Sequence, residues 1–326
     1  MVFPTMGTGF VRWGACEKVP ARAILPHAAQ GGTGASLQFM GVGPLQTATT
    51  LAALRTASSA LRSSGSLALV PTMGALHEGH LTLVREARAA AEHVAVSIFV
   101  NPRQFGENED LDAYPRQMAR DSALLEAEGV ALLWAPAPEE VYPPGYATNI
   151  SVSGISDGLC GADRPGHFDG VATVVCKLFN QVQPDLAFFG EKDWQQLAVI
   201  RRMARDLDLT LPHVDAIRGV PIVREADGLA RSSRNAYLTS SQRAAAAALP
   251  RQMETAIARL VAGEDADAVL SDLAGGLLGA GFDSVDYADL RRDSDLVPAS
   301  DAAPGNRLFV AARIGGTRLI DNMPVA

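Results

Sequence analysis

The sequence predicts an α/β protein with a parallel sheet, followed by a smaller α+β domain with an antiparallel sheet. Short apolar runs alternate with helical segments of roughly 10 to 15 residues, which is typical of a parallel sheet covered on both faces. Past Pro221 this alternation gives way to two Ala-rich stretches and then extended segments. Polar clusters directly follow several apolar runs, and such sheets bind ligands at the carboxyl ends of their strands.

The first domain owes its predicted elements to apolar spacing. Runs of aliphatic and aromatic residues predict strands at 67–70, 94–100, 131–134 and 186–189. Helical periodicity predicts helices at 51–61, 81–91, 115–128, 171–182 and 194–207.

The second domain is expected to begin near residues 218–221. Its helices are predicted at 242–260, with a break or restart at Pro250, and at 266–278. Extended segments follow at 284–288, 307–312 and 317–320, and Gly315-Gly316 indicates a tight turn before the last. We therefore expect domains at 45–219 and 220–326. Residues 1–44, which lack sustained periodicity, are expected to form a disordered extension.

Bulk composition excludes several classes of protein. The 326 residues carry a net charge of −8, which argues against a nucleic-acid or anionic-membrane surface. No apolar run approaches the roughly 20 residues that span a bilayer. The three cysteines show neither metal-ligand spacing nor a disulfide framework, so we expect a reduced, cytoplasmic protein.

The segment 71–80 (PTMGALHEGH) carries the first chemical signal. His77 and His80 lie three residues apart at a predicted helix start, where both could donate to one anion. Gly79 allows close backbone approach, and the helix dipole adds attraction, so the segment suits a triphosphate. Two surface histidines are an alternative. A zinc site is another, although zinc pairs on helices prefer a spacing of four and need further ligands.

A second cluster, Gly190-Glu191-Lys192-Asp193, follows the strand at 186–189. Lys192 offers a compact charge for phosphate oxygens, and Asp193 could accept hydrogens from ribose hydroxyls. Gln196 could present its amide on the same face. An ordinary helix N-terminus has the same composition, so this alternative stays open.

The segment 224–235 (READGLARSSRN) is the third cluster. Ser232, Ser233 and Arg234 suit a polyphosphate leaving group, and the segment could close over a nucleotide. A polar interdomain linker is the alternative.

A fourth cluster follows the strand at 94–100. Its Gln104 is a neutral donor and acceptor for a polar substrate, whereas the acids at 107, 109, 110 and 112 are expected to be solvated. His167 is expected to be structural or substrate-shaping. The sequence has no P-loop motif and no Gly-x-Ser-x-Gly elbow, so neither a P-loop enzyme nor a covalent nucleophile is indicated.

Four strings together resemble the pantothenate synthetase family of the His-x-Gly-His nucleotidyltransferase superfamily, from about Leu45 onward. They are PTMGALHEGH at 71–80, SIFVNPRQFG at 97–106, FFGEKDWQQL at 188–197 and READGLARSSRN at 224–235. The resemblance implies a Rossmann-like N-terminal domain and a smaller C-terminal domain that acts as a lid and is associated with dimer formation. It also implies a homodimeric AMP-forming ligase that joins pantoate to β-alanine through pantoyl adenylate, with ATP as substrate and Mg²⁺ as metal. A related adenylyltransferase with another acceptor is the alternative, and a nucleotide-binding regulator without catalysis is a third reading.

The resemblance also implies roles for single residues. His80 would be the proton donor, and His77 and Lys192 would bind phosphates. Gln104 and Gln196 would hold pantoate, with Gln104 also facing β-alanine, and Asp121 would be associated with Mg²⁺. The implied ATP-binding residues are Met73, Gly74, Ala75, Leu76, His77, Glu78, Gly79, His80, Gly190, Glu191, Lys192, Asp193, Val223, Arg231, Ser232, Ser233 and Arg234.

The chain departs from the family pattern at a few positions. Arg231 stands where members commonly have Met or Leu, so the contact implied there could be made by the backbone. Trp194 replaces a smaller aromatic residue. Arg120 stands where some members have an acid beside Asp121, which puts the metal assignment in doubt, and residues 1–44 have no counterpart.

Overall fold

A computed structural model of the chain describes residues 44–106, 111 and 114–325. The expected extension at 1–44, except residue 44, and the acids at 107, 109, 110 and 112 lie outside the described residues. None of the helices in the described ranges is long and apolar enough to cross a membrane.

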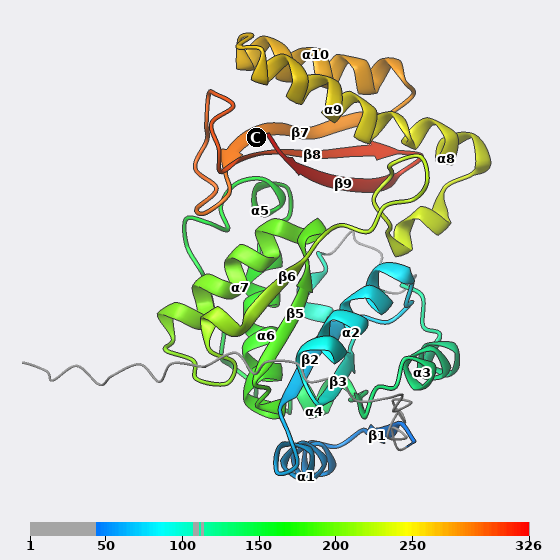
Figure 1. The fold of residues 1–326 in the computed structure, drawn as a ribbon, viewed down its shortest axis with the longest axis vertical. Coiled ribbons are helices and arrows are strands. Elements are labelled where there is room, and N and C mark those ends of the chain that lie inside the picture. Colours follow the sequence, from blue (N-terminus) through cyan, green and yellow to red (C-terminus); the bar gives the residue numbers. More distant parts are fainter. Residues whose placement is uncertain (1–43, 107–110, 112–113, 326) are drawn as a thin grey trace, which may run out of the picture. The chain divides into compact units, whose positions relative to one another are not determined.

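The first sheet has six parallel strands in the order β1-β4-β3-β2-β5-β6 (Figure 1). The strands are β1 (Gln46–Ala48), β2 (Leu67–Thr72), β3 (His93–Ile98), β4 (Leu132–Trp134), β5 (Leu186–Gly190) and β6 (Ile217–Val220). The four predicted strands are confirmed, whereas β1 and β6 were not predicted. The strand order changes direction between β2 and β5, and such a switch point is where open α/β sheets bind ligands.

Helices cover both faces of this sheet, as the buried strands require. In β2, Leu67 and Leu69 belong to one apolar cluster, and Ala68 and Val70 belong to another on the opposite face. The first cluster includes residues of α1 (Leu51–Arg62), α6 (His167–Val182) and α7 (Trp194–Asp206). The second includes residues of α2 (Glu78–Ala90) and α3 (Met118–Ala127). Short helices α4 (Pro138–Val141) and α5 (Cys160–Asp163) and the 3-10 turns η1 (Pro102–Gln104), η2 (Glu191–Asp193) and η3 (Val214–Ala216) complete this part.

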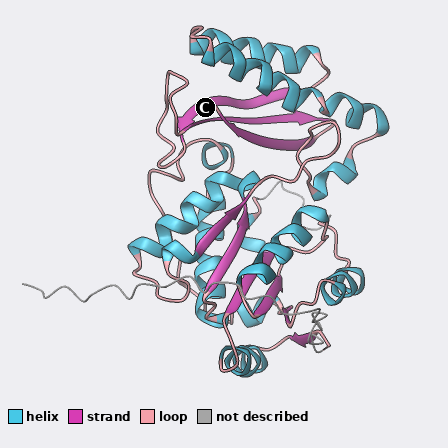
Figure 2. Ribbon diagram, in the orientation of Figure 1, coloured by secondary structure: helices cyan, strands magenta, loops and turns pink. Residues whose placement is uncertain are grey.

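The second sheet has three antiparallel strands in the order β7-β8-β9, with helices packed on one face (Figure 2). Its strands are β7 (Ser284–Arg292), β8 (Asn306–Ile314) and β9 (Thr317–Pro324), and its helices are α8 (Ser240–Ala246), α9 (Ala248–Val261) and α10 (Ala266–Gly279). The predicted turn is confirmed: Gly315 and Gly316 join β8 to β9 with φ values of 57° and 77°, which other residues adopt only with strain.

The predicted helix at 242–260 is interrupted, but not at Pro250. The break falls at Ala247, between α8 and α9, and Pro250 lies inside the first turn of α9. A proline is tolerated there because the first N–H groups of a helix have no intrahelical acceptor. The apolar core of this part begins at Leu229 and is separate from both clusters around the first sheet. The domain boundary at residues 219 and 220 remains a prediction.

Candidate functional site

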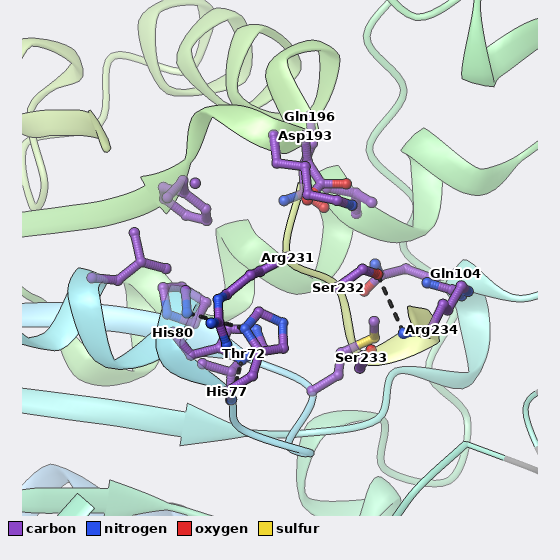
Figure 3. A pocket seen from close by; sticks show the side chains of 18 of the residues that line it. Thr72, His77, His80, Gln104, Asp193, Gln196, Arg231, Ser232, Ser233 and Arg234 are labelled. Carbon is purple, nitrogen blue, oxygen red and sulfur yellow. Dashed lines mark hydrogen bonds between the residues drawn. The ribbon is translucent and has the colours of Figure 1, made fainter. Parts of the chain in front are cut away.

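A cavity of about 240 Å³ lies beyond the carboxyl ends of β2 and β5, and Figure 3 shows part of its wall. It brings together residues from all four sequence clusters. The predicted residues on its wall are Met73, His77, Gly79, His80, Gln104, Gly190, Lys192, Asp193, Gln196, Val223, Arg231, Ser232, Ser233 and Arg234. A larger cavity of about 820 Å³ shares Gln104, Lys192, Asp193, Gln196, Ser232 and Arg234 with it.

His77 and His80 are held at the start of α2. His77 is the N-cap, and its Nδ1 accepts from the N–H of Gly79 at 3.1 Å. His80 lies in the first turn, and its Nδ1 accepts from the N–H of His77 at 3.3 Å. The two rings stack with centroids 4.1 Å apart. The helix therefore begins three residues earlier than predicted, and its own capping bonds orient both rings.

These bonds determine the tautomer of each ring. Because Nδ1 accepts in both histidines, the proton of the neutral ring is on Nε2, which is left as a donor. Burial, with Lys192 and Arg231 adding to it, lowers the pKa of His77 to about 4. Burial, with His77 and Lys192 adding to it, lowers the pKa of His80 to about 3. Both rings are neutral N–H donors in the free protein at neutral pH, and an anion bound beside them would raise both pKa values.

The loop between β2 and α2 is anchored by Asp121 from α3. This carboxylate is 1% exposed and accepts from the N–H groups of Ala75 at 2.8 Å and Leu76 at 3.0 Å. Gly74 donates its N–H to the Thr72 hydroxyl at 3.2 Å. Asp121 does not line the cavity, and no group of three or more potential metal ligands occurs among the described residues. This placement gives Asp121 a structural task that differs from the metal association implied by the resemblance.

Five of the implied ATP-binding residues do not lie on the cavity wall. Gly74, Ala75 and Leu76 are buried within the loop between β2 and α2. Glu78 pairs with Arg85 on the surface of α2. Glu191 offers its carbonyl oxygen to Asn322 of β9 at 2.9 Å. These residues belong to the same segments as the residues that line the cavity, but they do not line it themselves.

The segment from Arg231 to Arg234 forms another side of the cavity. Ser232 caps the 3-10 turn η4 (Ser233–Tyr237) by accepting from the N–H of Arg234 at 3.3 Å. Arg231 extends toward His77 and His80 in Figure 3, and its charge contributes to the lowered pKa of His77. Its Nε is buried without a hydrogen-bond partner. This guanidinium is therefore a side-chain donor next to the histidines, at a position where the sequence departs from the pattern that it resembles.

Gln104 is buried, and a set of polar contacts fixes it. Its Oε1 accepts from Asn101 Nδ2 at 2.9 Å. Its backbone carbonyl accepts from His167 Nδ1 at 2.9 Å and from Arg164 Nη2 at 3.2 Å. Gly170 of α6 permits this arrangement, because a Cβ there would stand 2.1 Å from the backbone oxygen of Arg103. His167 thus orients Gln104 and lines the cavity, as expected of a structural or substrate-shaping residue.

Sequence reasoning missed two contributions to the wall. Arg164 lines both cavities but stands in a loop that carries no recognisable motif apart from His167. An apolar wall comes from Phe99, Phe189 and one face of α6, formed by Val171, Val174, Val175 and Leu178. The spacing on α6 predicted a helix with an apolar face. It gave no sign that part of this face borders a cavity.

Comparison with known proteins agrees with this geometry. A family model described as pantoate-beta-alanine ligase matches residues 46–324. The chain is 66% identical over 284 residues to a pantothenate synthetase from Novosphingobium aromaticivorans, covering 86% of this chain and 99% of the relative. It is 58% identical over 276 residues to one from Sphingopyxis alaskensis, covering 84% and 98%.

Solved structures also resemble the chain in fold. A pantothenate synthetase from Thermus thermophilus matches with a TM-score of 0.80 at 46% identity, covering 86% of this chain and 99% of that one. A pantoate-beta-alanine ligase from Francisella tularensis, complexed with beta-gamma ATP and beta-alanine, matches with a TM-score of 0.73 at 32% identity, covering 86% and 98%. Because the family model spans both sheets and the cavity between their loops, this chain belongs to the pantoate-beta-alanine ligase family.

Proposed function

We propose that this chain condenses pantoate with β-alanine, using ATP and releasing AMP and pyrophosphate. One observation carries the proposal beyond family membership. A single cavity gathers two neutral histidine N–H donors, Lys192, three arginines and two glutamines at a sheet switch point. This is a set of phosphate-binding groups beside neutral groups suited to a small polar acid.

The first step is adenylation of pantoate. A carboxylate oxygen of pantoate attacks the α-phosphorus of ATP, the bond from that phosphorus to the β-phosphate oxygen breaks, and pyrophosphate leaves with the bonding electrons. Charge develops on the phosphoryl oxygens, where the Nε2–H groups of His77 and His80 and the ammonium of Lys192 are donors. Arg231 and Arg234, with the two serine hydroxyls, would hold the departing pyrophosphate. Val223 would meet the adenine, and Gly190 and Asp193 the ribose.

The second step transfers the pantoyl group. The amine of β-alanine attacks the acyl carbon of pantoyl adenylate, an amide bond forms, the bond to the phosphate oxygen breaks, and AMP leaves. The amine loses a proton, which is released as the product forms. Neither step needs a covalent bond to the protein, so positioning and charge are the main tools of catalysis. With AMP bound, His80 is our candidate for a proton donor, because a nearby phosphate raises the pKa that burial depresses.

Pantoate has a carboxylate and hydroxyls at its ends and two methyl groups between them. Gln104 and Gln196 offer amides for the polar ends, and the apolar wall of α6 suits the methyl groups. Gln104 also borders the larger cavity, from which β-alanine would approach.

We propose that Mg²⁺ enters with ATP. Mg²⁺ is usually bound through substrate phosphates, water and at most one or two carboxylates. Asp121 does not fit as its main ligand, because both of its oxygens are engaged by backbone N–H groups beneath the loop. No step above depends on the metal.

The proposal extends to the setting of the enzyme. A biosynthetic ligase whose two cysteines among the described residues, Cys160 and Cys176, form no disulfide is expected to work in the cytoplasm as a homodimer on small molecules, without nucleic-acid or membrane partners. Residues 45–219 would bind ATP and pantoate, and residues 220–326 would act as the lid.

Isotope exchange between pyrophosphate and ATP tests this function. We expect exchange that requires pantoate but not β-alanine, and AMP release once β-alanine is added. Exchange without pantoate, or ADP as the product, would contradict the mechanism, and exchange with a different acid alone would favour a related adenylyltransferase. His80→Ala and Lys192→Ala should each abolish exchange while retaining the fold, with the exposed His213→Ala as the matched control.

A further inference from the structure

Two adjacent residues of β9, Asp321 and Asn322, contact both of the segments that carry the phosphate-binding groups. They are 2% and 3% exposed, and neither lies on the wall of the smaller cavity. Asn322 reaches η2, the turn that bears Lys192. Asp321 reaches a hairpin formed by residues 223–231, which leads into Ser232.

Asn322 holds the turn η2. Its Nδ2 donates to the carbonyl of Glu191 at 2.9 Å and to the carbonyl of Lys192 at 3.0 Å. Its Oδ1 accepts from Arg307 Nη1 at 2.7 Å. All three bonds are buried or partly buried, and together they use both N–H donors of the amide and one lone pair of its oxygen. The backbone of Lys192 is therefore tied to β9.

A second contact secures the same turn from the side. The guanidinium carbon of Arg307 lies 3.7 Å from the centroid of the Trp194 ring. Trp194 Nε1 in turn donates to the carbonyl of Asp293 at 3.0 Å. The larger aromatic residue noted in the sequence thus joins the start of α7 to the second sheet, through a stacked cation and a hydrogen bond that a phenyl ring cannot make.

Asp321 holds the base of the hairpin. Both of its oxygens accept from Arg224, at 2.7 and 2.9 Å, and Arg224 also donates to the carbonyl of Gly228 at 2.9 Å. The hairpin closes where the N–H of Arg231 donates to the carbonyl of Val223 at 2.9 Å. The carboxylate therefore fixes a segment that ends one residue before Ser232.

Because Asp321 and Asn322 are consecutive, a single peptide unit links the two anchoring points. We propose that they are positioning residues, which keep Lys192 and the Ser232–Arg234 segment at the mutual distance that adenylation needs. This inference rests on the proposed function, since it assigns both segments to ATP. It predicts that loosening either anchor harms the step in which pyrophosphate leaves and spares the step in which β-alanine attacks.

The test separates the two half-reactions in the full-length protein. Adenylation is followed by pyrophosphate–ATP exchange across ATP concentrations, and transfer is followed by AMP release from synthetic pantoyl adenylate and β-alanine. For Asn322→Ala and Asp321→Asn, we expect kcat and kcat/KM for exchange to fall together by about 10- to 100-fold, as displaced catalytic groups do. Transfer should stay within about threefold of the wild type.

Asn306→Ala is the matched control, because Asn306 is a buried amide of the same sheet that bonds to Asp301 and touches neither segment. It should leave both half-reactions near the wild type. Trp194→Phe is a milder variant that is less prone to misfold, because it keeps an aromatic ring beside Arg307. It removes the bond to Asp293 and weakens the stacking on Arg307. We expect a smaller loss, of about threefold, confined to exchange.

Equal losses in both half-reactions would overturn the inference in favour of a general structural role. A loss confined to transfer would overturn it in favour of direct contact with β-alanine, because both residues border the larger cavity. Unchanged exchange in all three variants would also overturn it. Failure of the proposed function itself is distinguishable, because the wild type would then show no pantoate-dependent exchange.

Discussion

Replacing Asp121 by Asn tests whether this residue anchors the loop before α2 or binds Mg²⁺. The two oxygens of Asp121 accept from Ala75 and Leu76 at a site that is 1% exposed. Asparagine keeps the shape but offers one oxygen, so one backbone N–H would face an amide that is itself a donor. A hydrogen bond to a charged group contributes about 1.5–3 kcal/mol, and an unsatisfied buried donor costs about 1–3 kcal/mol. We expect the free energy of unfolding to fall by about 2–4 kcal/mol.

Urea unfolding without Mg²⁺ measures this loss, with the exposed Asp215→Asn as the matched control. Pyrophosphate–ATP exchange over a range of Mg²⁺ concentrations completes the assay. The rate of pyrophosphate–ATP exchange should fall by a similar factor at every Mg²⁺ concentration, because the substitution displaces the loop and removes no metal ligand. Unchanged or increased stability, together with activity restored by excess Mg²⁺, would refute the anchoring role and support metal binding.

Three further predictions concern other parts of the site. Arg231→Met should raise the KM for ATP by about tenfold, because it removes a partly buried guanidinium whose buried Nε has no hydrogen-bond partner; unaltered exchange kinetics would show that only the backbone matters there. The free energy of unfolding of the free protein should decrease as the pH falls from about 6.5 to 4. Histidine in the unfolded chain has a pKa near 6.5, whereas burial lowers the pKa of His77 to about 4 and that of His80 to about 3. The unfolded state therefore binds more protons in that window, and His80→Gln should flatten the decline in urea midpoints; an identical slope would contradict this. Gly170→Ala should destabilise the fold by pressing on η1, whereas Gly275→Ala, with open space around it in α10, should stabilise it by up to about 1 kcal/mol; the reverse order of thermal midpoints would refute the packing argument.

The strands that could be predicted are those whose burial shows in their composition. β2 and β3 are almost continuous apolar runs, which is typical of strands covered on both faces. β6 reads Ile-Arg-Gly-Val and β1 reads Gln-Thr-Ala, and neither has a recognisable pattern. These edge strands owe their conformation to the pairing offered by β5 and β4. Tertiary context, which no local window contains, overrides weak propensity there.

The candidate site was predictable in part because its clusters stand at the ends of recognisable strands. Parallel topology then brings those clusters to one edge. The sequence could not predict the contacts between distant residues that hold these clusters in place. Arg224 and Asp321 are 97 positions apart, and Asp121 is 46 from Ala75, so neither pair has a local signature. Gly170 likewise reads as an unfavourable helix residue until its neighbour is known.

The bonds that start α2 also decide which ions the histidine pair admits. A zinc ion bound at Nε2 would require the ring proton to move to Nδ1. In both rings Nδ1 already accepts from a backbone N–H, so the moved proton would point at another donor. Coordination would break two bonds of the helix start, whereas a phosphate oxygen accepts from Nε2–H without disturbing them. A pair of histidines whose sequence resembles a metal site is thereby selective for anions over transition metals. The backbone N–H groups that bond to Nδ1 at the start of the helix are the source of this selectivity.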